Sequence, residues 1–328
     1  MGPVAGEKSL LNYRDWAALP RKSCREAYGA ALRRLGEIND QVVVLEADVG
    51  NSTKSVLFSE AFPDRYFNVG IAENNMLGVA AGLAACGKIP FANTFAVFAT
   101  MRAGDPLRSL IAYTGLNVKV AASYAGLSDS YDGATHQSVE DLAIARALPN
   151  LTVLVPADAH QTVQAVMAAA AYRGPVFIRL SRAVLPVIYK EEAGFPIGRG
   201  RVLRRGADVT LIACGYMVYK ALQAAEMLAA DYSIKAGVID MSTIKPLDTA
   251  LLREAAEETG RIVTIEEHSI HGGLGSAVAE YLIQHHPVPM RLLGLPDVFG
   301  ESGDYEALLT HFRLDAPGIT KAVADFCR

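Results

Sequence analysis

One carboxylate, Glu73, stands at the start of a segment of small and apolar residues, GIAENNMLGVAAGLAACG (70–87). Removal from water disfavours the charged form of a carboxylate, so a lone ionised carboxylate is rarely buried. Glu73 is therefore either a solvated residue at a helix N-terminus, where the helix dipole favours it, or a group that a site uses to share a proton.

Other polar side chains follow segments that are rich in β-branched residues. Ser52 comes after 41–50, Asp132 and His136 come after 117–126, and Arg182 ends 174–182. In open α/β sheets, ligands bind at the carboxyl ends of the strands, so these four side chains can converge on one pocket. Taken singly, each residue also has a purely structural interpretation. Ser52 and Asp132 are residue types that shape turns, and Arg182 can be a solvated charge at the end of a strand.

Short apolar strands alternate with helical segments along the chain, a pattern that predicts an α/β fold with mainly parallel, doubly wound sheets. The stretch VIYKEEAGFPIGRG (187–200) interrupts this alternation, which then resumes. We expect a first domain over 1–190 and a smaller one over 191–328. The strands are predicted in 41–50, 88–98, 117–126, 151–158, 174–182, 208–215, 234–243, 261–269 and 290–297.

Composition excludes several classes of protein. The chain has 328 residues, of which 51% are hydrophobic and 20% charged, and its net charge of -4 offers no basic field for a nucleic acid. No apolar run approaches the roughly 20 residues of a membrane span. The first residues carry no apolar signal region, so we expect a cytoplasmic protein.

The four cysteines, Cys24, Cys86, Cys214 and Cys327, are far apart, so neither a metal site nor a disulfide framework is predicted.

Several motifs together resemble the carboxyl-terminal half of transketolase, a thiamine-diphosphate enzyme. The resemblance covers nearly the whole chain, from LPRKSCREAYGAAL to GLPDVFGESGDYEALL. It is carried by GIAENNMLGVAAGLA, FANTFAVF, DGATHQSVEDLAIARALPNLTVLVPAD, FIRLSR and EEHSIHGGLGSAVAE. It implies a pyrimidine-binding domain followed by a transketolase C-terminal domain.

The resemblance gives Glu73 a catalytic role at the cofactor. The matching carboxylate hydrogen-bonds a ring nitrogen of the aminopyrimidine and favours the imino tautomer, which accepts the proton from the thiazolium C2. Phe95 and Phe98 match aromatic residues that form the pyrimidine pocket. Met101 falls where transketolases often carry another aromatic, so that wall of the cofactor site is expected to differ.

Substrate residues are implied in the same way. Arg21, Ser52 and Arg182 match residues at the phosphate end of the sugar, where arginine pairs bidentately with phosphate oxygens. Asp132 and His136 match residues that face the sugar hydroxyls and the reacting carbonyl, which makes His136 the second predicted catalytic residue. Transketolases carry another histidine upstream of this motif, and here GLSDSYDG holds none. The preferred sugar is therefore left open.

The family binds the cofactor diphosphate through Mg²⁺ or Ca²⁺ held by a Gly-Asp-Gly motif, which this sequence lacks. The resemblance implies that an amino-terminal transketolase subunit supplies it and that the two chains form an α2β2 heterotetramer acting on sugar phosphates. His268 and His271 in EEHSIHGGLG lie in the half that is usually remote from the chemistry, and their role is left open. Neither histidine is predicted to be catalytic.

Two other functions remain open. The β subunit of a 2-oxo-acid dehydrogenase first component has the same two domains and the same divided site, but DGATHQ with a phosphate-binding arginine argues against it. A non-catalytic assembly subunit is the other alternative, and joint retention of Glu73, Phe98, His136 and Arg182 argues against that one.

Overall fold

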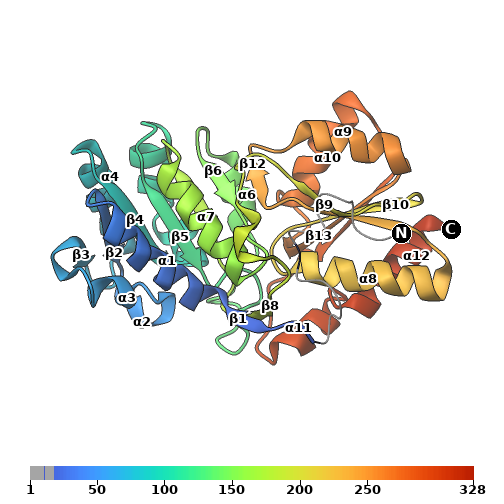
Figure 1. Cartoon of the computed structure of the whole chain (residues 1–328), viewed down its shortest axis with the longest axis horizontal. Helices are drawn as coiled ribbons and strands as arrows, with labels where there is room; N and C mark the ends of the chain where they lie inside the picture. The colour runs from blue at the N-terminus through green and yellow to red at the C-terminus, as the bar shows by residue number, and fades with distance from the viewer. Residues whose placement is uncertain (1–10, 12–17) are drawn as a thin grey trace.

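The computed structural model describes Leu11 and residues 18–328, which form two large β-sheets flanked by helices and one two-stranded sheet. A seven-stranded sheet fills one half of the molecule and a five-stranded sheet the other (Figure 1). The predicted α/β class and the two parallel-stranded sheets with flanking helices are confirmed.

The first sheet has the order β12-β6-β7-β5-β4-β2-β3, and every neighbouring pair except β12–β6 is parallel. Its parallel strands are β2 (Val42–Glu46), β3 (Tyr66–Asn68), β4 (Ile89–Phe95), β5 (Lys119–Ser123), β6 (Thr152–Leu154) and β7 (Val176–Arg179). Its helical elements are α1 (Cys24–Ile38), α2 (Gly50–Thr53), α3 (Val56–Ser59), η2 (Pro63–Arg65), α4 (Glu73–Ala85), η3 (Phe98–Arg102), α5 (Gly104–Pro106), η4 (Leu107–Ala112), α6 (Asp141–Ala147) and α7 (Ala159–Ala171).

The second sheet has the order β14-β13-β10-β11-β9, with only β9 antiparallel to its neighbour. Its strands are β9 (Arg201–Arg204), β10 (Val209–Ala213), β11 (Ala236–Asp240), β13 (Ile262–Ser269) and β14 (Met290–Leu295). Helices α9 and α10 pack on one face, and α8 and α12 pack on the other (Figure 1). The helices are α8 (Met217–Tyr232), α9 (Thr249–Thr259), α10 (Leu274–His285), α11 (Tyr305–His311) and α12 (Ala316–Cys327), with the short turn η5 (Glu191–Ala193) before them.

Two pairs of short strands join parts of the chain that are far apart in the sequence. β12 (Thr243–Lys245) comes from the second half of the sequence but pairs antiparallel with β6 at the edge of the first sheet. β1 (Arg21–Ser23) pairs antiparallel with β8 (Val184–Pro186) and so joins the start of α1 to the end of the first sheet. β12 is not predicted from the sequence, because a three-residue strand has too few positions to show a period.

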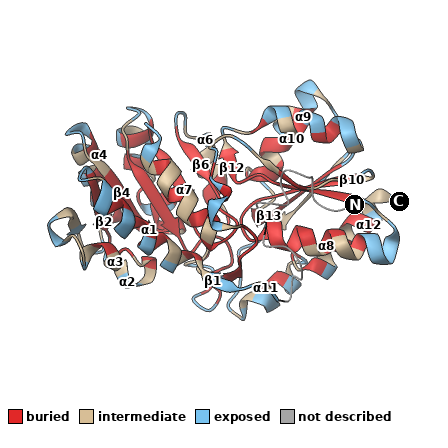
Figure 2. Cartoon of the chain, in the orientation of Figure 1, coloured by how far each residue is buried: buried red, intermediate tan, exposed pale blue. Residues whose placement is uncertain are grey.

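Burial follows the layers of the fold. The central strands of each sheet are buried along all or nearly all of their length, whereas the outer faces of the helices are exposed (Figure 2). Strands covered on both faces need continuous apolar runs such as VVVL in β2, which is why the sequence shows runs there rather than alternation. Of the helices in residues 18–328, none combines the length and apolar character that crossing a membrane requires.

Helix α1 shows how local sequence positions a functional side chain. Ser23 accepts a hydrogen bond from the Glu26 backbone N–H and caps the helix, and Tyr28, Leu32 and Leu35 form a buried stripe on one face. Burial of each such side chain contributes about 1.5–3 kcal/mol. The buried stripe fixes the rotation of the helix and thereby the direction in which Arg25, in its first turn, projects.

Candidate functional site

The candidate site lies at the carboxyl ends of the parallel strands in the first sheet. Ser52 follows β2, Phe95 ends β4, Tyr124 follows β5 and Arg182 follows β7. These strands are neighbours in the order β7-β5-β4-β2, so their ends meet along one edge. This is the position at which open α/β sheets bind ligands.

Glu73 is the first residue of α4, and only 5% of its surface is exposed. The guanidinium of Arg102, at the end of η3, donates a hydrogen bond from Nη1 to Glu73 Oε1 over 2.9 Å. Glu73 thus lies at the positive end of the α4 dipole and beside a cation. A buried carboxylate is therefore held in a fixed position by one charged partner.

An aromatic cluster adjoins this carboxylate. The ring of Phe95 stacks on Tyr124 with centroids 4.0 Å apart and on Phe98 with centroids 5.5 Å apart. The His136 ring lies edge-on to Phe98, 5.4 Å between centroids. The structure thus brings together both aromatic residues predicted for the cofactor and the predicted catalytic histidine. Met101, in η3, is 54% exposed.

Tyr124 has an unusual backbone conformation. Its φ is +62°, in the left-handed region that large side chains seldom adopt. The conformation directs the ring onto Phe95 and the hydroxyl to Arg25 Nη1, which donates to it over 2.7 Å. Strain of this kind costs on the order of 1–3 kcal/mol and is concentrated at functional sites.

Two arginines, Arg25 and Arg182, flank the ring of Tyr124 and form a cationic pair. The guanidinium carbons of Arg25 and Arg182 lie 5.1 and 5.4 Å from the centre of its ring. Arg25 Nη1 also donates to the backbone oxygen of Ser52 over 2.7 Å. Two positive charges next to a serine form a binding place for an anion with several oxygen atoms.

The structure distinguishes Arg25 from the predicted Arg21. Arg21 is exposed and donates through Nη2 to the backbone oxygen of Val184 over 2.8 Å, within the β1–β8 pair. Both arginines line a groove of about 520 Å³ between the starts of α1 and α7, but Arg25 is the one that reaches Ser52. Arg25 was not predicted from the sequence, although its position before the apolar stripe of α1 is visible there.

Two carboxyl groups lie beside Arg182. Asp129 is buried with its Oδ1 atom 3.5 Å from Arg182 Nε, whereas Asp132 is exposed. Burial, followed by the nearby carboxylate of Asp132, raises the pKa of Asp129 to about 7, and the positive charge of Arg182 opposes that rise. Asp129 is thus a second site residue that the sequence analysis did not single out.

The second half of the chain holds the loop that carries Asp132 and His136. Gly303 N–H donates to the Ser130 backbone oxygen over 2.9 Å, and Gln137 Nε2 donates to the Glu301 backbone oxygen over 2.8 Å. Gly133 has a φ of +76°, and a Cβ atom there would lie 2.3 Å from Ser302 Oγ. The loop therefore requires glycine where it meets the second half.

The two histidines of EEHSIHGGLG lie outside this group of residues. His268 is buried and its Nδ1 lies 2.7 Å from the Ser269 backbone oxygen, whereas His271 is exposed. In the part of the chain that the structure describes, no three His, Cys, Asp or Glu side chains are grouped so as to hold a metal ion. Glu266 Oε2 lies 3.8 Å from His268 Nδ1, but this carboxylate also accepts hydrogen bonds from the backbone N–H groups of Leu274 and Gly275 at the start of α10.

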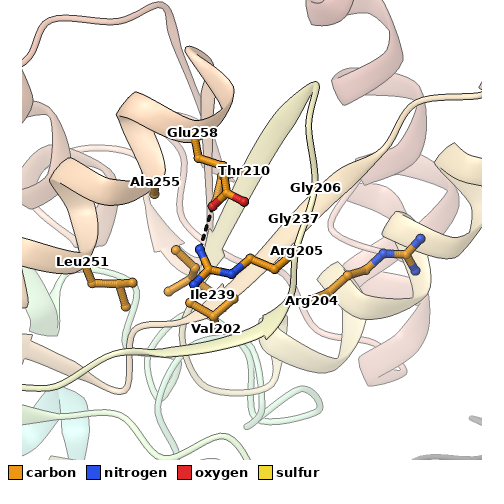
Figure 3. Close-up of a pocket in the computed structure, with 10 residues that line it drawn as sticks. All are labelled: Val202, Arg204, Arg205, Gly206, Thr210, Gly237, Ile239, Leu251, Ala255 and Glu258. Atoms are coloured by element: carbon orange, nitrogen blue, oxygen red, sulfur yellow. Dashed lines mark hydrogen bonds and ion pairs between the residues drawn. The ribbon is translucent and has the colours of Figure 1, made fainter. Parts of the chain in front are cut away.

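A separate pocket in the second sheet has no capacity for a cofactor. Its volume is about 10 Å³, near the minimum for one water molecule. Figure 3 shows Arg205 beside it in an ion pair with Glu258, 2.7 Å between Nη1 and Oε2, while Arg204 points away. The pocket is a packing gap next to an ion pair.

Comparison with known proteins gives consistent matches over both halves of the chain. Residues 21–187 match the family model "Transketolase, pyrimidine binding domain" and residues 198–319 match "Transketolase, C-terminal domain". A putative transketolase C-terminal section of Methanocaldococcus jannaschii is 44% identical over 93% of this chain and 96% of its own length. A 6-deoxy-6-sulfo-D-fructose transketolase subunit of a Clostridium species is 43% identical over 91% and 92%.

A solved structure supports the same assignment. It is described as a split gene transketolase in an inactive beta4 tetramer and is 52% identical to this chain. It superposes with a TM-score of 0.87 over 93% of this chain and 98% of its own.

Proposed function

Because the chain belongs to the transketolase family, we propose that it is the C-terminal subunit of a split transketolase. In this proposal it transfers a two-carbon ketol unit from a ketose phosphate to an aldose phosphate, with thiamine diphosphate shared with a separate N-terminal subunit. The observation that carries the proposal is a single sheet edge on which a buried carboxylate, an aromatic cluster and a cationic pair lie together.

Three side chains fit the pyrimidine half of the cofactor. Glu73 offers a buried carboxylate to a ring nitrogen, and Phe95 and Phe98 offer aromatic faces beside it. Thiamine diphosphate, when bound, supplies the carbon nucleophile that attacks the sugar carbonyl. Glu73 would share a proton with the ring nitrogen in a site that excludes water, where such a hydrogen bond is stronger. Met101 would line the same wall.

The remaining residues fit the sugar. Arg25 and Arg182 would bind the terminal phosphate next to Ser52, since charge-assisted hydrogen bonds from arginine suit a phosphate group. His136, which contacts the aromatic cluster, would donate to the oxygen of the reacting carbonyl, and Asp132 would accept from a hydroxyl. The Clostridium relative is named for a sulfonated sugar. A sulfonate has the same tetrahedral oxygens, so it is the competing substrate in the test below.

The diphosphate half of the cofactor is assigned to the partner chain. That subunit would carry Gly-Asp-Gly and the Mg²⁺ or Ca²⁺ ligands, because carboxylate and carbonyl oxygens are the ligands these ions prefer. We propose an α2β2 assembly, with domains over 1–190 and 191–328 in this chain. The similar split transketolase described as an inactive beta4 tetramer is consistent with a subunit that needs a partner.

Purification of this chain alone and together with the amino-terminal subunit tests the proposal. The isolated chain is expected to bind thiamine diphosphate weakly and to transfer no ketol unit, because a stacked ring and one carboxylate cannot replace a metal-bridged diphosphate. The mixture is expected to form a heteromer that acts on ketose phosphates more efficiently than on sulfonated or unsubstituted analogues. Oxidative decarboxylation of a 2-oxo acid with acyl transfer to lipoamide would identify the dehydrogenase alternative. Ketol transfer by the isolated chain would refute the divided site.

A further inference from the structure

Arg102 contacts both groups that are proposed to receive the cofactor pyrimidine. Its Nη1 atom is 2.9 Å from Glu73 Oε1, and its guanidinium carbon is 3.6 Å from the centre of the Phe98 ring. Phe98 begins and Arg102 ends the π-helix η3, a rare helix type that occurs most often at functional sites. The guanidinium therefore bridges a buried carboxylate and an aromatic face.

This arrangement reproduces the contacts of an aminopyrimidine. Both groups are planar, both place a nitrogen atom against the carboxylate, and both stack on an aromatic ring; the guanidinium donates its own N–H, whereas the ring nitrogen would use the proton that it shares with Glu73. A separation of 3.6 Å between the guanidinium carbon and the ring centre is van der Waals contact, so no second ring fits between them. A pyrimidine cannot stack on that face of Phe98 and reach Glu73 while Arg102 keeps this position.

The two ends of the ion pair differ in exposure. The Glu73 side chain is 6% exposed, and the Arg102 side chain is 49% exposed. The carboxylate is fixed at the start of α4, whereas the arginine can leave toward solvent by rotation of its own side chain. Arg102 is the movable partner of the pair.

We propose that Arg102 occupies the pyrimidine position in the cofactor-free chain and leaves it when thiamine diphosphate binds. The inference rests on the proposed function, since it assumes that the Glu73 site receives this cofactor. In the free chain Arg102 supplies the buried carboxylate with a counter-charge and covers the Phe98 face. The cofactor must displace it, so the affinity is reduced by the fraction of molecules in which Arg102 is out of the site.

Arg102→Ala tests this inference in the complex with the amino-terminal subunit. Calorimetric titration with thiamine diphosphate and Mg²⁺ is expected to give a Kd about tenfold lower than for the wild type. This factor follows if the half-exposed ion pair and the cation–π contact keep Arg102 in the cofactor position in about nine tenths of the wild-type molecules. Stopped-flow measurement is expected to show faster association. Arg102→Lys keeps a positive charge near Glu73 but loses the planar stack, so its Kd is expected to lie between the two.

Arg108→Ala is the matched control, because Arg108 is an exposed arginine in the adjoining η4. This variant is expected to bind cofactor like the wild type. If Arg102→Ala binds cofactor equally or more weakly while the wild-type complex binds it, the inference is wrong and Arg102 is not displaced. If the wild-type complex binds no thiamine diphosphate, the proposed function fails and the inference fails with it. A thermal melt of each variant confirms that the compared proteins are folded.

Discussion

Arg25 and Arg21 are four positions apart, in α1 and β1, and the structure predicts different consequences for their removal. Arg25→Ala removes a guanidinium that reaches Ser52 and Tyr124. A hydrogen bond to a charged group contributes about 1.5–3 kcal/mol, so kcat/KM for a phosphorylated ketose is expected to fall about 10- to 150-fold. Arg21→Ala removes an exposed side chain, whose loss costs about 0.5 kcal/mol or less, and is expected to change kcat/KM about twofold at most.

The assay compares each sugar with and without its phosphate, using the complex with the amino-terminal subunit. Arg25→Ala is expected to lower kcat/KM for the phosphorylated sugar and to leave the unphosphorylated one within about threefold, since only phosphate receives the charge-assisted pair. Arg182→Ala is expected to behave in the same way. Arg21→Ala is the matched control and also tests the role predicted from the sequence. Equal losses for both sugars in the Arg25 variant, or a selective loss in the Arg21 variant, would refute the assignment of Arg25 to phosphate.

Three further predictions concern individual carboxyl and imidazole groups. Glu73→Gln is expected to lower ketol transfer by about 10²–10⁴ without loss of the fold, and near-normal turnover in the purified complex would contradict its role as a proton-sharing group. His136→Ala is expected to lower kcat about 10²-fold or more with a smaller change in KM, and a variant altered only in melting temperature would show a structural role. Burial raises the pKa of Glu267 from 4.5 to about 7, so its contribution to stability is complete below pH 4.5 and is lost as the pH rises through 7. The wild type is therefore expected to lose up to about 1.4 kcal/mol of unfolding free energy per pH unit between pH 4.5 and 7, a loss that Glu267→Gln does not share because its side chain does not titrate. If the unfolding free energies of the two proteins change with pH in parallel over this range, the pKa of Glu267 is not raised.

The sequence predicted the elements that have a strong period or a long apolar run. The strands β2, β4, β5 and β7 lie within the segments predicted as strands, and the signal is strongest in β2, whose run VVVL suits a strand that is covered on both faces. The convergence of Ser52 and Arg182 followed from one rule, that the carboxyl ends of parallel strands share an edge. Such features depend on local sequence and on the topology of the sheet.

Side-chain direction could not be predicted in the same way. PRKSCREAYG contains two arginines four positions apart, and only the rotation of α1, fixed by the burial of Tyr28 and Leu32, decides that Arg25 reaches Ser52. Arg102 was missed for a related reason. Its contact with Glu73 spans 29 positions and depends on a π-helix, whose wider turn changes which residues face each other.

The second half of the chain contributes to the site more directly than the sequence analysis expected. Glu267, in β13, accepts a hydrogen bond from the Leu127 backbone N–H over 2.6 Å and another from the Tyr305 hydroxyl over 2.7 Å. Leu127 precedes the loop that carries Asp132 and His136, and a Cβ atom at neighbouring Gly126 would lie 2.5 Å from Glu267 Oε1. The loop is thus held at its start by β13 and at its end by the segment before α11. Because a displacement of about 1 Å in a catalytic group can cost on the order of 10² in rate, the role proposed for His136 implies that the second half affects the rate by fixing the position of this loop.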